Sequence, residues 1–307
     1  MNRLTLRLNR IGIVCALVVV PAPCAFSQDG GGSPGSVVFY STRDTQPNNQ
    51  IYLMDPDGGN QRRVIFDTAS DVDPDISPNG KNIVFTSNQT GNKDIFVENL
   101  RSGAVWNLTN NPSTDEWARF SPDGKQIVFD SNRDSGVFEI FVANADGSGV
   151  PTQLTFLPAS GRYPDWSPDG KQIVLKYNSD IAIINADGTG TPTQLTHENP
   201  GSLAQMAVWS PDGRHMAFMS LREGYCSVFR MNTDGSDQIN LTPKDAADAP
   251  TTWCSRAPAW STNGREIYFM SFRPSTLGQS EIFVMNMDGT NVRQLTSLGT
   301  SGEPRAR

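Results

Sequence analysis

The chain has 307 residues, of which 37% are hydrophobic and 19% are charged, and its formal net charge is -7. This length allows a large buried core. The acidic charge, with no basic stripe along the sequence, argues against nucleic acid as a partner.

The first segment has the features of a signal peptide. Three arginines precede an apolar run at residues 11–20, and prolines and small residues follow that run. The run is too short to span a bilayer well, so we predict no permanent membrane span. We predict that residues 1–27 are a cleaved signal peptide and that residues 28–32 are a Gly-rich linker. The mature protein is then periplasmic or secreted. Prolines flank Cys24, which disfavours lipidation of that residue.

One sequence phrase then recurs along the chain at spacings of about 45 residues. An aromatic or aliphatic residue precedes Ser-Pro-Asp-Gly or a close variant, and a short hydrophobic strand follows. A later strand ends in Asn-x-Asp-Gly, and the phrase Gln-Leu-Thr comes next. Proline, aspartate and glycine are the residues of tight turns, whereas β-branched and aromatic residues favour strands. Each repeat therefore predicts four short antiparallel strands, called A to D. The first phrase begins at Ile76, Phe120, Trp166, Trp209 and Trp260.

A four-strand repeat of this length is typical of a propeller blade. The central position of strand B recurs at Phe39, Phe85, Phe129, Leu175, Phe218 and Phe269, which predicts six blades. The first repeat lacks strand A. Pro304 near the C-terminus matches the proline that precedes strand A tryptophans in other repeats. We therefore predict an all-β, six-bladed β-propeller over residues 33–307, closed by a C-terminal segment that supplies strand A of blade 1.

The three tryptophans at the start of this phrase, Trp166, Trp209 and Trp260, recur in register. We interpret that recurrence as packing between blades. Trp117 and Trp253 are out of this register, and we expect them to be exposed near the mouth of the channel, where they could contact a ligand.

These repeats resemble the WD40-like repeats of the TolB family. The resemblance rests on Trp-Ser-Pro-Asp-Gly, Ile-Phe-Val-x-Asn-x-Asp-Gly and Gln-Leu-Thr, and it covers about residues 33–307. It implies a periplasmic propeller that binds a protein partner on one face, as in an envelope complex of the Tol-Pal kind. TolB also carries an α/β domain before its propeller. Here only residues 28–32 separate the signal from blade 1, so we expect that domain to be absent.

Two other kinds of function stay open at this stage. Similar repeats occur in some lyases, so one alternative is a polysaccharide lyase or hydrolase with a metal in the central channel. The other is a structural scaffold in an envelope complex. Such an enzyme needs convergent histidines or carboxylates, and the chain has only two histidines, His197 and His215, in different blades. We therefore predict a monomeric, non-catalytic protein without a metal or cofactor.

The segments just before each strand A supply the predicted binding site. Propeller blades surround a central channel, and their loops converge at its mouth. We expect a mixed acidic and aromatic ring there, to which Arg162 and Gln205 also belong. Its candidate binding residues are Asp73, Asp75, Asp115, Glu116, Trp117, Tyr163, Asp165, Trp253, Arg256 and Glu303.

Two cysteines, Cys226 and Cys254, remain after removal of the signal peptide. Cys226 opens strand C of blade 5, and Cys254 lies just before strand A of blade 6. In antiparallel blades these two positions fall on one face of the propeller. We predict a disulfide between them, since an exported protein folds in an oxidising compartment.

Overall fold

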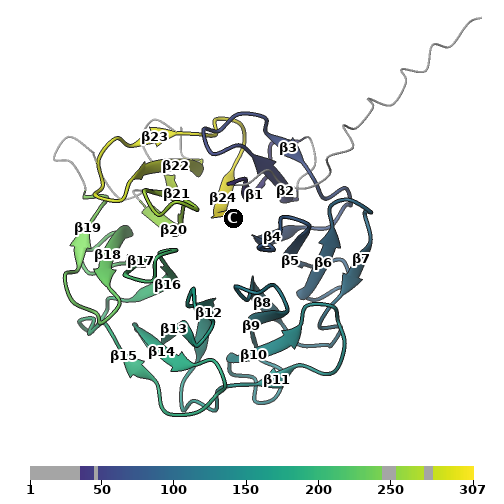
Figure 1. Ribbon diagram of the computed structural model, residues 1–307, viewed down its shortest axis with the longest axis horizontal. Helices are drawn as coiled ribbons and strands as arrows, with labels where there is room; N and C mark the ends of the chain where they lie inside the picture. Colours follow the sequence, from purple (N-terminus) through teal and green to yellow (C-terminus); the bar gives the residue numbers. More distant parts are fainter. Residues whose placement is uncertain (1–34, 45–47, 244–253, 273–278) are drawn as a thin grey trace, which may run out of the picture.

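The computed structural model describes residues 35–44, 48–243, 254–272 and 279–307. The predicted signal peptide and Gly-rich linker lie outside these residues, as does Trp253. Across the described ranges, no helix is long and apolar enough to cross a membrane. Their strands form six four-stranded antiparallel sheets that stand around a central axis (Figure 1). The predicted all-β, six-bladed propeller is confirmed.

Each blade has one strand at the channel and three further strands toward the rim. Blade 1 contains β24 (Ser301–Ala306), β1 (Val37–Ser41), β2 (Gln50–Met54) and β3 (Arg62–Arg63). Blade 2 contains β4 (Asp71–Ile76), β5 (Asn82–Ser87), β6 (Asp94–Asn99) and β7 (Val105–Asn107). Blade 3 contains β8 (Asp115–Phe120), β9 (Gln126–Ser131), β10 (Glu139–Asn144) and β11 (Thr152–Gln153). Blade 4 contains β12 (Gly161–Trp166), β13 (Gln172–Tyr177), β14 (Asp180–Asn185) and β15 (Thr193–Gln194). Blade 5 contains β16 (Ala204–Trp209), β17 (His215–Ser220), β18 (Ser227–Asn232) and β19 (Ile239–Asn240). Blade 6 contains β20 (Cys254–Trp260), β21 (Glu266–Phe272), β22 (Glu281–Asn286) and β23 (Arg293–Gln294).

Aromatic pairs hold the middle strands of most blades in register. Phe129 pairs with Phe141 across β9 and β10, and their rings stack with centroids 5.8 Å apart. The same strand positions carry stacked rings in blades 1, 2, 5 and 6. Cross-strand aromatic pairs stabilise a sheet and define its register, so the recurring strand B position specifies how each blade is assembled.

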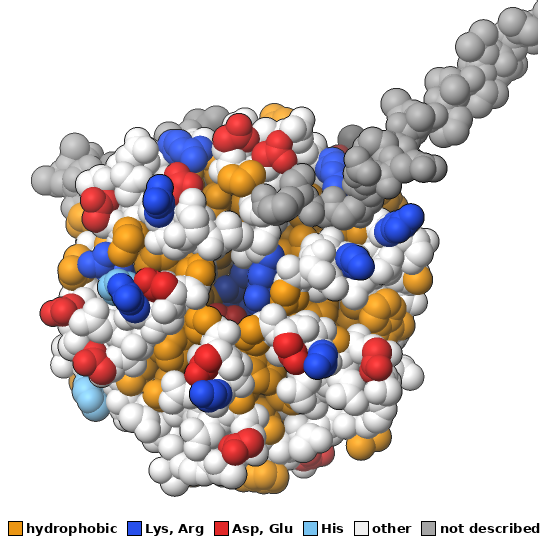
Figure 2. Space-filling model, in the orientation of Figure 1, with side chains coloured by type: hydrophobic (Ala, Val, Ile, Leu, Met, Phe, Trp, Pro, Cys, Tyr) orange, Lys and Arg blue, Asp and Glu red, His pale blue; other side chains and the backbone are white. Residues whose placement is uncertain are grey.

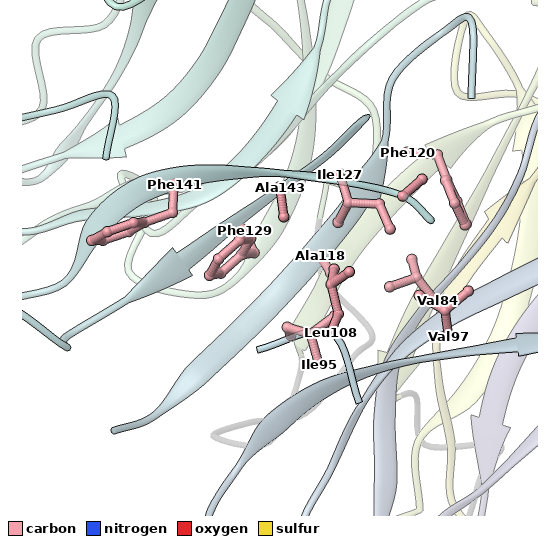
Figure 3. Packing of buried hydrophobic residues seen from close by; sticks show 11 residues of the cluster. Val84, Ile95, Val97, Leu108, Ala118, Phe120, Ile127, Phe129, Phe141 and Ala143 are labelled. Atoms are coloured by element: carbon pink, nitrogen blue, oxygen red, sulfur yellow. The ribbon is translucent and has the colours of Figure 1, made fainter. Parts of the chain in front are cut away.

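The hydrophobic core lies between neighbouring blades. Figure 3 shows one such layer, in which Val84 and Val97 of blade 2 face Phe120 and Ile127 of blade 3. The recurring tryptophans add bonds between blades. Nε1 of Trp166 donates to the carbonyl of Arg119 at 3.2 Å, and Nε1 of Trp260 donates to the carbonyl of Val208 at 3.3 Å. The predicted role of these tryptophans in blade packing is confirmed.

The last strand closes the ring as predicted. β24 pairs antiparallel with β1, from Val37 opposite Ala306 to Ser41 opposite Ser301. Figure 1 shows these two strands side by side at the channel. Gly302 allows this close approach, because a Cβ there would lie 2.5 Å from the Tyr40 ring and 2.6 Å from Sδ of Met270. The two ends of the described propeller are therefore joined by a sheet rather than by loops.

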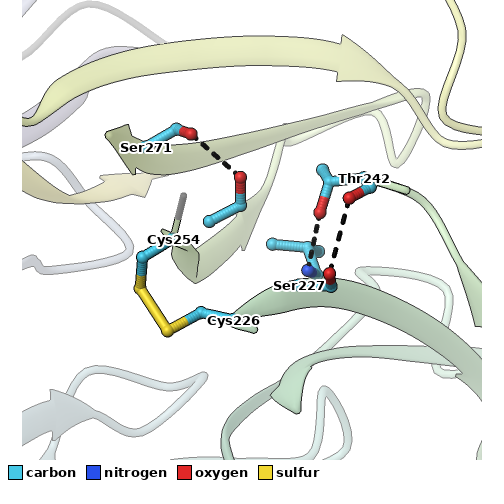
Figure 4. The surroundings of a disulfide bond; sticks show 7 residues. Cys226, Ser227, Thr242, Cys254 and Ser271 are labelled. Atoms are coloured by element: carbon cyan, nitrogen blue, oxygen red, sulfur yellow. Dashed lines mark hydrogen bonds between the residues drawn. A yellow bond between two sulfur atoms is a disulfide. The ribbon is translucent and has the colours of Figure 1, made fainter. Parts of the chain in front are cut away.

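A disulfide links two neighbouring blades. Cys226, just before β18, bonds to Cys254 at the start of β20, with the two Cα atoms 4.4 Å apart (Figure 4). The backbone amide of Ser255 also donates to the carbonyl of Cys226 at 3.0 Å. The bridge closes a sequence separation of 28 residues. It therefore attaches strand C of blade 5 to strand A of blade 6.

Each inner strand contains a bulge at the same level. The pairing register shifts within β4, β8, β12, β16, β20 and β24. The residue at the bulge has a left-handed backbone, with φ between 50° and 57°, at Asp73, Trp117, Tyr163, Met206, Ala257 and Glu303. A bulge redirects a side chain out of the regular ladder. Residues of this kind from blades 3, 4, 5 and 6 contact one another, which places them in the channel.

Candidate binding site in the central channel

The predicted site residues occupy three depths of the channel rather than one ring. Successive residues of a strand advance by about 3.3 Å, and the bulge separates those before it from those after it. The first two positions of the inner strands lie at the end where the B–C loops and D–A connections meet. The bulge positions lie in the middle. The fifth positions, which include Asp75 and Asp165, lie next to the Ser-Pro-Asp-Gly turns at the opposite end.

Charged residues at the first level pair with one another. Glu116 forms ion pairs with Arg162 of the next blade and with Lys93. Nε of Arg162 also lies 3.3 Å from Oδ2 of Asp130, a carboxyl whose pKa is raised to about 7 by burial. These ion pairs connect blade 3 to blade 4 and, through Lys93, to blade 2, so the side chains already have partners within the protein.

Asp115 and Arg256, which lie at the same level, also have partners within the protein. Asp115 is fully buried, and its Oδ1 accepts from Nη2 of Arg133 at 2.9 Å. The guanidinium of Arg256 lies over the Phe272 ring, 6.0 Å from its centroid. The charged side chains of the predicted acidic rim therefore mainly contact other residues of this protein.

The bulge residues fill the middle of the channel. Trp117 and Tyr163 meet edge to face with ring centroids 4.6 Å apart, and Met206 and Ala257 pack against them. Trp117 is only 8% exposed. The expectation that Trp117 is exposed at the mouth is wrong, because the bulge in β8 turns its ring inward.

Two carboxyl groups complete this middle level. Oε2 of Glu303 accepts a hydrogen bond from the backbone amide of Asp73 at 3.0 Å. Burial, followed by the nearby Asp73 carboxylate, raises the pKa of Glu303 well above its usual value. Nη1 of Arg119 donates to the carbonyl of Asp73 at 3.1 Å. This level therefore has one apolar side and one acidic side.

A cavity of about 320 Å³ opens at the end formed by the Ser-Pro-Asp-Gly turns. Its rim carries the prolines of four of these turns, Pro78, Pro122, Pro168 and Pro211, with Thr262 in the last turn. Tryptophans 166, 209 and 260 contribute to its walls, and Arg305 and Arg307 of the closing strand segment project into it. Figure 2 shows this hollow at the centre of the face, with basic side chains inside it and hydrophobic side chains around it.

The two acidic residues of the cavity bond to the neighbouring blade. Oδ2 of Asp75 accepts from the backbone amide of Phe120 at 2.9 Å and lies 3.7 Å from Nη2 of Arg307. Oδ2 of Asp165 accepts from the backbone amide of Trp209 at 3.4 Å, and burial raises the pKa of Asp165. These carboxylates are thus used to connect blades.

The two arginines of the cavity differ in their bonding partners. Arg307 donates to the carbonyl of Phe120 at 3.2 Å. Burial and the nearby charge of Arg119 lower the pKa of Arg305 to about 10. Among the residues that the structure describes, none forms a hydrogen bond or an ion pair with the Arg305 guanidinium.

Sequence reasoning missed the arginines of this cavity. Arg119, Arg305, Asp75 and Asp165 occupy the fifth position of their inner strands. Charged residues at one repeat position in four of six blades are a signal that an alignment of the repeats could have provided. Asp75 and Asp165 were among the predicted binding residues, but we expected them at the same mouth as the others, whereas they line the cavity at the opposite end.

No group of three or more His, Cys, Asp or Glu side chains is arranged to hold a metal ion within the described part of the chain. The ring of His215 lies 6.5 Å from that of Trp260, and Nδ1 of His197 lies 3.2 Å from Nε2 of Gln194 on strand D. Neither histidine lines the cavity.

A family model described as the TolB beta propeller domain matches residues 69–180. Among curated proteins, the chain is 33% identical over 120 residues to a TolB homolog of Chlorobium luteolum, in an alignment covering 39% of this chain and 27% of that protein. It is 36% identical over 56 residues to the Tol-Pal system protein TolB of Bordetella pertussis, covering 18% and 13% of the two chains. These alignments span about a quarter or less of the curated relatives.

Solved structures match over most of the chain. A putative TolB from Agrobacterium tumefaciens has a TM-score of 0.66 at 23% identity, covering 89% of this chain and 92% of that one. TolB from Acinetobacter baumannii has a TM-score of 0.70 at 20% identity, covering 89% and 66%. An oligogalacturonate lyase in complex with manganese has a TM-score of 0.59 at 13% identity, covering 88% and 74%. At these identities the likeness is one of fold.

Proposed function

From its TolB-like, six-bladed propeller, we propose that this protein is a non-catalytic binding protein that takes a protein partner of the cell envelope at the cavity between the Ser-Pro-Asp-Gly turns. The partner belongs to an envelope complex of the Tol-Pal kind. Residues 1–27 act as the export signal, so the mature protein works in the periplasm or outside the cell. It acts as a monomer, in which β24 of the same chain pairs with β1 and completes blade 1.

The observation that carries this proposal is the cavity itself. It is concave, its walls are mainly proline and tryptophan, and a small number of charged groups converge on it. Binding sites generally have this combination of apolar walls and a few placed polar groups. A volume of about 320 Å³ holds a few side chains rather than a folded domain. The partner therefore inserts a short segment, while the surrounding face contacts its remaining surface.

The enzymatic alternative has less support. A lyase that uses a metal needs several ligands arranged around one ion. The cavity offers Asp75 and Asp165, and each already accepts a backbone amide of the neighbouring blade. The fold shared with an oligogalacturonate lyase does not transfer its activity, because one fold supports many functions.

Affinity capture from envelope extracts of the source organism tests the proposal. The wild-type protein, Arg305→Gln and Thr262→Trp are immobilised and the retained proteins identified by mass spectrometry. The matched control is Arg62→Gln, which removes the same charge from an exposed position on β3. We expect a protein that wild type and Arg62→Gln retain and that both cavity variants lose. Equal retention of every captured protein by all four chains contradicts the proposal.

A further inference from the structure

We propose that the cavity recognises a carboxylate side chain within an acidic peptide segment of the partner, with Arg305 as the group that binds it and Arg307 beside it. The rim prolines and the half-buried Trp209 then receive the apolar side chains next to that acid. This inference rests on the proposed function, since it names the chemistry of the segment that the partner inserts.

The charged groups that line the cavity are two arginines and two carboxylates, Arg305 and Arg307 with Asp75 and Asp165. The guanidinium of Arg119 lies outside this lining and interacts electrostatically with Arg305, Asp165 and Glu303. What distinguishes the groups of the cavity is therefore how each of them is bonded.

The charged groups at the cavity differ in whether they already have a hydrogen-bond partner within the protein. Asp75 and Asp165 accept backbone amides of Phe120 and Trp209, which fixes these carboxylates against the neighbouring blades. Arg119 is buried and donates to two backbone carbonyls. The guanidinium of Arg305 has no hydrogen-bond acceptor among the described residues. This cation faces the open cavity without an acceptor from the protein, and an incoming carboxylate would form charge-assisted hydrogen bonds with it.

The lining of the cavity also indicates which kind of anion it takes. Of the three tryptophans in the lining, Trp166 and Trp260 are packed between blades and only 6% and 5% exposed, so the half-buried Trp209 alone offers ring surface on which a sugar could stack. A phosphate group carries up to two negative charges. One guanidinium without an acceptor, beside two fixed carboxylates, favours a singly charged group. The side chain of glutamate or aspartate fits this requirement, and prolines on the rim suit aliphatic neighbours.

Defined probes test this inference on the full exported protein. We would titrate Ac-Leu-Glu-Leu-NH2, Ac-Leu-Gln-Leu-NH2, trigalacturonate and inorganic phosphate at low ionic strength. Binding is followed by the arginine Nε–Hε signals in 15N-resolved NMR spectra. Arg305→Gln identifies the signal of Arg305, and Arg62→Gln is the control of equal charge.

We expect the glutamate peptide to shift the Arg305 signal and to bind about tenfold or more tightly than its glutamine analogue. We expect Arg305→Gln to lose at least about tenfold in affinity and Arg62→Gln to lose none. Equal binding of the two peptides overturns the inference, as does unchanged binding by Arg305→Gln. Tighter binding of trigalacturonate or phosphate than of the glutamate peptide also overturns it, because the cavity then serves another class of anion.

The experiments distinguish an error in the acidic-segment inference from an error in the proposed function. If the captured partner is lost by Thr262→Trp but the peptides bind equally, the cavity binds a protein through contacts other than a carboxylate. In that case the proposed function stands and the acidic-segment inference is wrong.

Discussion

Oε2 of Glu303 accepts a hydrogen bond from the backbone amide of Asp73 at 3.0 Å, although the two residues are 230 positions apart in the sequence. Glu303 belongs to β24, the strand that closes blade 1, whereas Asp73 belongs to β4, the inner strand of blade 2. The closing strand therefore bonds both to its own sheet and to the next blade. Both residues lie at bulges, so the bond depends on two local departures from regular strand geometry.

The raised pKa of the Glu303 carboxyl predicts a pH dependence of stability. Its pKa is raised in the folded protein by burial and by Asp73, so the folded state holds this proton more tightly than the unfolded state does. Stability should therefore fall as pH rises from about 4.5 through the folded pKa. Glu303→Gln keeps an acceptor for the Asp73 amide and removes the titration.

We expect urea unfolding of Glu303→Gln to show a flatter dependence on pH than that of wild type, with the variant at least as stable at pH 8. Glu223→Gln, which changes an exposed residue, serves as the control. A wild-type slope that persists unchanged in Glu303→Gln would contradict this assignment.

The closing strand also depends on a glycine at position 302. A Cβ there would lie 2.5 Å from the Tyr40 ring and 2.6 Å from Sδ of Met270, both of which are buried. Gly302→Val should lower the free energy of unfolding by about 3 kcal/mol or more, because a packed core resists added volume. Gly136→Ala is the comparison, since a Cβ there meets nothing within 4 Å and only its φ of 76° opposes the change. We expect it to cost about 1 kcal/mol; equal costs would argue against tight packing at Gly302.

Removal of the disulfide should weaken the contact between blades 5 and 6. The paired change Cys226→Ser and Cys254→Ser frees a loop with a sequence separation of 28 residues. We expect a loss of about 3 kcal/mol in the free energy of unfolding, chiefly because the unfolded chain gains freedom. Thermal or urea unfolding measures this loss. Mass spectrometry of exported wild-type protein is the accompanying check, and two free thiols would refute the bridge.

Two tryptophans at equivalent repeat positions should respond differently to substitution. Nε1 of Trp260 donates to the carbonyl of Val208, whereas Nε1 of Trp209 is buried with no hydrogen-bond partner within the described ranges. Trp260→Phe should therefore cost about 1 kcal/mol more than Trp209→Phe, since only the first removes a hydrogen bond. Each variant also loses ring volume, so the pair controls for packing. Equal losses in urea unfolding would mean that the bond to Val208 contributes nothing.

The fold could be predicted from the sequence because each blade repeats the same turn chemistry and the same strand B position. Closure by the last strand could also be predicted, since Pro304 stands where Pro74, Pro164 and Pro258 stand in other repeats. Both predictions rest on local sequence patterns that recur from blade to blade.

The site could be predicted only in part. The left-handed backbone of Trp117 and Tyr163 has no signature in the sequence. Residues other than glycine rarely adopt this conformation, so their residue types do not predict it. The six bulges decide which residues face which level of the channel. Without them, Asp73 and Asp75 could not be assigned to different depths, and the cavity around Arg305 could not be located.

Photo-crosslinking within living cells tests the central claim, that a protein partner inserts at the Ser-Pro-Asp-Gly end of the channel. A photoreactive phenylalanine analogue is placed at Thr262, which lines the cavity, or at Ser148, an exposed residue in the turn between β10 and β11. We predict a discrete protein adduct from position 262 that is absent from position 148 and is lost when Arg305→Gln is added. An adduct of equal yield at both positions, or no protein adduct from position 262, would contradict it.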